Sequence, residues 1–137
     1  MKKRQGFSPL EVHLGHVVGD TVAHLTRGFH YVDADGIKHT SPARMMTDGL
    51  SIPRFLWRVF GAPFASRYLA SGIIHDAGCI EAHRLNDDFN DYKGAVAYRL
   101  QYDKLFREML LFQGCSRSRS WWLYQGVRIG ARSLRRS

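Results

Sequence analysis

A histidine and an aspartate stand side by side in "IIHDAG", residues 73–78, inside an otherwise apolar stretch. Burying charge is costly unless it is paired or bound to a metal ion. Neighbouring residues of a helix point about 100° apart, so His75 and Asp76 reach one ion together only where the helix ends or bends. Gly78 favours such a bend. The alternative is that His75 is a core histidine hydrogen-bonded to a backbone carbonyl.

The same histidine begins a second spacing, because His75, Cys79 and His83 are four residues apart and form one stripe of a helix. Histidine and cysteine are good zinc ligands. The first and third lie about 12 Å apart along the axis, too far to share one ion, so at most two neighbours of the stripe form a pair. The alternative is that Cys79 is a small buried apolar residue.

Two further polar residues precede an aromatic run in "TDGLSIPRFLW", residues 47–57. Asp48 and Ser51 are typical helix-capping residues, and Pro53 suits a first helical turn. A cap explains one of them, whereas a site explains both if other polar groups converge there.

Asp103 is the last candidate, in the amphipathic run "AVAYRLQYDKLFREMLLFQG", residues 95–114. Arg99, Asp103 and Arg107 are four apart on one face, so ion pairing within the helix is the structural explanation of Asp103. The functional explanation makes it a metal ligand or a general base.

The elements that must position these residues are predicted from their patterns. The first forty residues are β-rich, and Asp35-Gly36 predicts a tight hairpin turn within residues 28–42. Helices are expected over "RFLWRVFG", over 64–84, over 95–114 and over 118–134, the last capped by Ser118 or Ser120. Residues 85–94 are expected to form a polar connection. The predicted fold is α+β, a short N-terminal β-hairpin layer packed on about four α-helices.

Composition fits one domain over residues 1–137 with a substantial core, since 45% of the residues are hydrophobic. No window approaches the about 18 apolar residues of a membrane span, and the basic start lacks the apolar run of a signal peptide. Cys79 and Cys115 make no disulfide framework, which indicates a reduced, intracellular protein.

The formal net charge is +8, and residues 117–137 carry six arginines and no acid. Such a block is typical of contact with a polyanion, and the alternative is a solvated helix face with a frayed tail. Trp121 and Trp122 can stack bases beside these arginines. Residues 132–137 are expected to hold no core contacts.

Four blocks in order resemble the bacteriophage and prophage family known as domain of unknown function 1353. The resemblance covers about residues 28–132. The matching positions are Thr47, Asp48, Ser51, Ile52, Pro53 and Arg54; His75 and Asp76; Asp103 and Phe106; and Tyr124, Val127, Arg128 and Gly130. Cys79 stands where the family tends to have tyrosine, and Tyr102 where it has alanine.

The resemblance implies a phage or prophage origin and gathers three acids and a histidine from separate elements, as a metal or acid–base site needs. The His-Asp pair is also similar to that of the HD-domain phosphohydrolases, although no upstream histidine matches, since His30 and His39 fall on predicted strands. We therefore expect a small phage protein that is a metal-dependent hydrolase of an anionic substrate. Its divalent metal ion would be held by Asp48, His75 and Asp76, with Asp103 and Ser51 in catalytic roles.

The second hypothesis is a non-enzymatic virion, tail or assembly component. In it Asp48 caps a helix, His75 and Asp76 form a buried pair, and Asp103 pairs with Arg99 or Arg107. Its partners would be phage structural proteins, or nucleic acid bound non-specifically by the arginine-rich C-terminus. Either hypothesis places the protein in the host cytoplasm during infection or in the virion.

Overall fold

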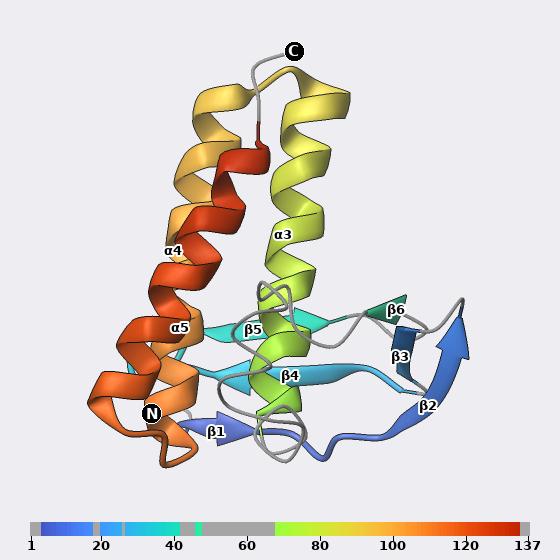
Figure 1. The fold of residues 1–137 in the computed structure, drawn as a ribbon, viewed down its shortest axis with the longest axis vertical. Coiled ribbons are helices and arrows are strands. Elements are labelled where there is room, and N and C mark those ends of the chain that lie inside the picture. Colours follow the sequence, from blue (N-terminus) through green and yellow to red (C-terminus); the bar gives the residue numbers. More distant parts are fainter. Residues whose placement is uncertain (1–3, 18–19, 26, 42–45, 48–67, 135–137) are drawn as a thin grey trace.

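The structure, a computed structural model, describes residues 4–17, 20–25, 27–41, 46–47 and 68–134. The strands in the described part are β1 (Gly6–Phe7), β2 (Val12–Val17), β3 (Asp20–Leu25), β4 (Phe29–Val32), β5 (Lys38–Ser41) and β6 (Met46–Thr47). The helices are α3 (Leu69–Phe89), α4 (Tyr92–Phe112), α5 (Arg117–Gly130) and the 3-10 helix η1 (Ala131–Ser133). Figure 1 shows α3 and α4 as a long antiparallel pair with α5 alongside and the strands across one end.

The strands form two antiparallel sheets, in the orders β1-β4-β5 and β2-β3-β6. The predicted hairpin at Asp35-Gly36 is confirmed, since β4 and β5 pair around it. Gly36 has a φ of 83°, a left-handed conformation that glycine adopts readily. Asp33 fixes the turn, because its Oδ1 accepts hydrogen bonds from the amides of Asp35 and Ile37 at 2.9 Å. The β layer is larger than the single hairpin expected, because β1 adds to β4 and a second sheet is present.

Tyr31 of β4 ties the first sheet to α4. Its hydroxyl donates to Glu108 Oε2 and accepts from Gln5 Nε2, both at 2.8 Å. The side chain is fully buried beside Ile73 of α3 and Met109 of α4. The sheet therefore covers the N-terminal half of α3 and the C-terminal half of α4.

The α+β class is confirmed, but the described residues hold three α-helices rather than about four. The helix expected on "RFLWRVFG" falls within residues 48–67, outside the described part of the chain.

Helix α3 is longer than predicted, because it runs to Phe89 instead of ending near residue 84. Within "LNDDF", Asn86 is buried while Asp87 and Asp88 are exposed, so the run continues the helix with the two acids on its solvent face. Asn90 ends α3 with a φ of 52°. Asparagine adopts this left-handed conformation more easily than most residues, and the connection to α4 shortens to two residues.

Two helix ends differ from the sequence expectation. Ser116 caps α5, since its Oγ accepts from the Arg119 amide at 3.2 Å; the predicted caps, Ser118 and Ser120, lie inside the helix. The expectation for the tail is corrected at Leu134, which is 5% exposed and packs with Ala82 and Ala95. The end of the described chain therefore does contribute to the core, through this one apolar residue.

In the described part of the chain, none of the helices has the length and apolar character needed to span a membrane. Cys79 and Cys115 are both buried, and neither is in a disulfide.

Candidate functional site

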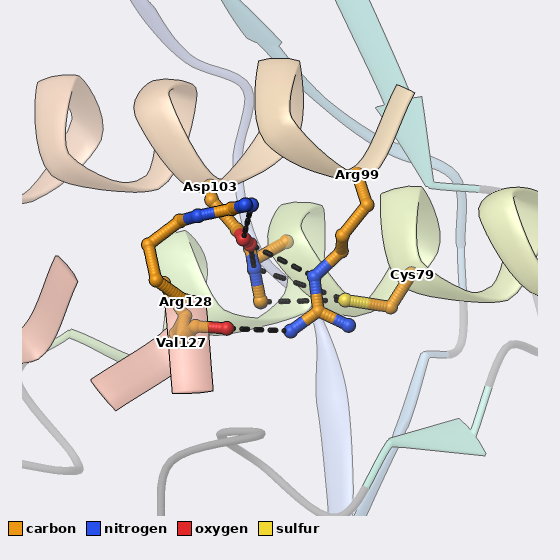
Figure 2. A network of polar contacts seen from close by, with 6 residues as sticks. Cys79, Arg99, Asp103, Val127 and Arg128 are labelled. Carbon is orange, nitrogen blue, oxygen red and sulfur yellow. Dashed lines mark hydrogen bonds and ion pairs between the residues drawn. The ribbon is translucent and has the colours of Figure 1, made fainter. Parts of the chain in front are cut away.

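The carboxylate of Asp103 is the centre of a buried polar network between the three helices. Asp103 has no exposed surface. Its Oδ1 accepts from His75 Nε2 at 2.6 Å and from Arg99 Nε at 2.9 Å, and its Oδ2 accepts from Arg128 Nη1 at 2.7 Å. Arg99 and Arg128 approach the carboxylate from opposite sides (Figure 2). A buried carboxylate needs such pairing, and here both of its oxygens have charged donors.

Each helix contributes one part of the network. His75 lies in the second turn of α3, and Arg99 and Asp103 are one turn apart on α4, where the i,i+4 spacing brings them together. Arg99 also donates through Nη2 to the Val127 carbonyl of α5 at 2.9 Å (Figure 2). The predicted Arg99–Asp103 pair is thus confirmed. Arg107 instead donates to Ser120 Oγ and to the Arg117 carbonyl.

The contacts of His75 fix its tautomer. Because the carboxylate only accepts, Nε2 carries the proton and Nδ1 is the acceptor nitrogen of the neutral ring. Cys79 Sγ lies 3.7 Å from both ring nitrogens, so the sulfur is placed beside the ring rather than in line with one nitrogen. Burial lowers the pKa of His75 below its ordinary value, against the opposing effect of Asp103.

The protonation of Asp103 follows from the same contacts. Burial acts to raise its pKa, but the hydrogen bond from His75 and the charges facing it outweigh that effect and hold the pKa below the usual value. With Asp103 ionised and His75 neutral, Arg99 and Arg128 leave the cluster with one net positive charge. Asp103 therefore holds two arginines in position, and the network as a whole is positively charged rather than acidic.

The predicted site residues have different outcomes. His75 and Asp103 are brought together at 2.6 Å. Asp76 is buried one position further along α3, where the helix turns its side chain about 100° away from His75. Asp48 and Ser51 lie outside the described residues, so their expected roles are untested. The expected His75–Asp76 pair is replaced, because His75 bonds across to α4.

A metal centre finds no support in the residues that the structure describes, where no group of three His, Cys, Asp or Glu side chains is placed to hold an ion. At Asp103 the reason is electrostatic. A dication bound there would have to displace two guanidinium groups that already occupy the carboxylate.

A pocket of about 530 Å³ opens beside the network, between the start of α4 and the end of α5. Its lining is Tyr92, Val96, Arg99, Arg128, Ala131, Arg132 and Leu134. Arg99 is almost buried at its inner side, Arg128 is partly exposed and Arg132 is exposed. The pocket thus combines three guanidinium groups with one aromatic ring and a few apolar side chains.

Sequence reasoning missed this pocket. The sequence marks Arg128 as a family position and Arg132 as part of a basic tail, and it places Tyr92 in the expected connection at 85–94. The available signal was the spacing of Arg128 and Arg132, which are four apart on one helical face, in a segment without acids. Arg99 could not be added, because its position depends on how α4 meets α5.

The family model for a protein of unknown function (DUF1353) matches residues 23–127. The chain belongs to this family. The matched DUF1353 region contains His75, Arg99 and Asp103 and ends one residue before Arg128.

The chain is also similar to an uncharacterized protein, y4jT, from Sinorhizobium fredii strain NBRC 101917 / NGR234, with 36% identity over 64 residues. That alignment covers 47% of this chain and 19% of the relative, so this DUF1353 chain matches about a fifth of the longer protein. No solved structure matches the chain.

Proposed function

We propose that this DUF1353 protein binds an anionic ligand, in the class of phosphate groups, in the pocket lined by Arg99, Arg128 and Arg132. The single observation that carries the proposal is the fully buried Asp103, which holds Arg99 and Arg128 in fixed positions at the pocket wall. Guanidinium groups bind phosphate through parallel, charge-assisted hydrogen bonds. Holding them in advance reduces the entropy lost on binding.

The roles differ among the three arginines. Arg99 donates through Nε to Asp103 and through Nη2 to the Val127 carbonyl, so it contributes mainly positive charge to the pocket. Arg128 gives Nη1 to Asp103 and presents the rest of its guanidinium at the pocket. Arg132 is exposed at the rim. The net charge of +2 from Arg99, Arg128, Arg132 and Asp103 suits a dianion.

Titration of inorganic phosphate, followed by calorimetry, tests the proposal. We expect millimolar affinity, and Arg132→Gln weakens it about tenfold, since a hydrogen bond to a charged group contributes on the order of 1.5 kcal/mol. Arg119→Gln is the matched control: Arg119 is also exposed, but it lies in the first turn of α5, whereas Arg132 lies in η1 beyond the other end of that helix. No phosphate binding at millimolar concentration, or equal effects of the two variants, would overturn the proposal.

A metal-dependent hydrolase is the second candidate. The observation that favours it is the neutral His75 ring, whose Nδ1 keeps its lone pair while Nε2 donates to Asp103; metal-binding histidines commonly have this arrangement. Asp48 and Asp76 would be the further ligands of the divalent ion, and Ser51 would position the substrate. Metal content of the purified protein and of His75→Ala tests it, and equal near-zero content in both rejects it.

We also propose a phage or prophage origin, on the strength of the four sequence blocks. The exposed Trp121 and Trp122 favour the alternative that the protein is a virion, tail or assembly component. Its partners would then be phage structural proteins, and it would be found in the host cytoplasm or in the particle. Detection in purified particles by mass spectrometry tests this placement.

A further inference from the structure

We propose that the seam between α4 and α5 binds single-stranded nucleic acid, with a backbone phosphate in the arginine pocket and a base stacked on Trp121. The α4–α5 seam is the row formed by Arg99, Arg107, Arg117, Trp121, Arg128 and Arg132. The inference rests on the proposed function, because it identifies the anion in the pocket as one phosphate of a chain.

Charge along the seam is the first support. The two acids of α4 are Asp103 and Glu108, and α5 has none. Asp103 is buried beneath His75, Arg99 and Arg128, and Glu108 accepts a hydrogen bond from the Tyr31 hydroxyl on the sheet side. The seam therefore has five arginines against the single buried acid Asp103 beside it, and a polyanion is the complementary partner.

Alignment along α5 is the second support. Arg117 and Trp121 are one turn apart and Trp121 and Arg128 two turns, so these three lie on one face of α5. Arg132 follows in η1 and lines the same pocket as Arg128. That face borders α4, because Arg128 reaches Asp103 of α4. The row extends about 22 Å from Arg117 to Arg132, and the pocket lies at its far end.

The near end of the row is also in contact with α4. Arg107 donates to Ser120 Oγ at 3.4 Å and to the Arg117 carbonyl at 3.5 Å. Its guanidinium therefore lies against the first turn of α5, next to Arg117. Cations thus stand at both ends of the seam, with an aromatic ring between them.

Trp121 supplies the stacking surface. Its side chain is 43% exposed, and its ring meets that of Trp122 edge to face at 5.0 Å between centroids. The indole of Trp122 holds the Trp121 ring in place. Trp122 itself is one residue further along the helix and therefore points about 100° away from the row. Bases stack on such rings whatever their identity, so binding is expected to be independent of sequence.

A lipid surface fits the seam less well. Helices that lie in a membrane interface bury a continuous apolar face, whereas this row begins and ends with arginines and has a single aromatic ring between them. Alternation of cations and an aromatic ring is the pattern of single-strand binding grooves.

The experiment measures anisotropy of a labelled oligodeoxythymidylate of about ten nucleotides, within the site sizes of such grooves. We expect the full chain to bind it and Trp121→Leu to weaken binding at least about fivefold. Trp122→Leu is the matched control and causes a smaller loss. Circular dichroism of both variants checks that the helices are retained, as expected for exposed side chains.

The outcomes separate this inference from the proposed function. Phosphate binding without oligonucleotide binding overturns the inference and leaves the anion site in place, whereas loss of both overturns both. Oligonucleotide binding that Trp122→Leu weakens as much as Trp121→Leu overturns the assigned face. Binding to phosphatidylglycerol vesicles, without oligonucleotide binding, assigns the seam to a membrane surface and overturns the inference as well.

Discussion

Asp103 shows how one residue can set the character of a site. As an exposed acid it would offer a ligand for a metal ion. Buried under His75, Arg99 and Arg128, it instead serves as the anchor that keeps two guanidinium groups in place. Removing one partner of such a buried pair typically costs about 3–5 kcal/mol, so the same contacts couple the site to the stability of the fold.

The pH dependence of stability follows from His75. Its ordinary pKa is 6.5, and burial lowers it in the folded protein. As the pH falls below 6.5, His75 of the unfolded chain takes up a proton that His75 of the folded chain does not. The free energy of unfolding therefore falls as the pH decreases. The slope reaches at most about 1.4 kcal/mol per pH unit for this one group. The pKa of Asp103 is also lowered in the folded protein, so the stability that its ionised form contributes is lost at still lower pH, as the carboxylate becomes protonated.

Urea unfolding between about pH 7 and pH 5 measures this effect. We expect a shallower decline in His75→Gln, whose amide still offers a donor to Asp103 but does not titrate. His83→Gln is the control, because His83 lies on the same helix and is partly exposed. Equal declines in wild type and His75→Gln would show that His75 is not the responsible group.

At the scale of elements, the sequence was sufficient where local chemistry decides the structure. Asp35-Gly36 predicted its hairpin, and the i,i+4 spacing predicted the Arg99–Asp103 pair. It was insufficient where packing decides. The acidic run after residue 84 predicts a connection rather than a helix, because the burial of Asn86 depends on a neighbouring helix. The contact of His75 with Asp103 spans 28 positions, and no periodicity predicts that.

Gly78 of α3 lies where this helix packs closely against α4. The sequence favours a bend at Gly78, whereas the residue lies within the continuous helix α3. A Cβ built there would stand 2.2 Å from ring carbons of Tyr102 on α4. Gly78→Ala would gain about 1 kcal/mol of helix propensity, but we expect a net loss of about 1–3 kcal/mol because the helices must move apart.

Thermal unfolding of Gly78→Ala beside Gly28→Ala measures the effect. A Cβ at Gly28 would meet nothing within 4 Å, so this control should change stability by no more than about 0.5 kcal/mol. A Gly78→Ala protein as stable as the wild type would show that α3 and α4 can separate without penalty.

At the scale of the whole molecule, the uneven distribution of charge determines where a polyanion is expected to bind, more than the net charge does. The chain carries +8, and the acids cease after Glu108. If Arg117, Arg128 and Arg132 each neutralise one phosphate of a single strand, the logarithm of affinity should fall with the logarithm of salt concentration at a slope of about −2.1. Arg132→Gln should reduce the slope to about −1.4.

Anisotropy titrations across a salt series provide the measurement, again with Arg119→Gln as the control. Charge substitution is preferable to deleting residues 132–137, because the deletion would also remove the buried Leu134. A slope that Arg119→Gln and Arg132→Gln reduce alike would indicate attraction to the net charge of the molecule rather than contact in the seam.

The three-sided coordination of Asp103 has a consequence for the order in which the molecule assembles. Its partners come from positions 75, 99 and 128, on three different helices. A state in which α4 has docked on α3 while α5 is still detached would enclose the carboxylate with one oxygen lacking its cation. A buried carboxylate that lacks one of its cations costs free energy, so we expect the three helices to pack and unpack together. The arginine pocket then exists only in the fully assembled protein.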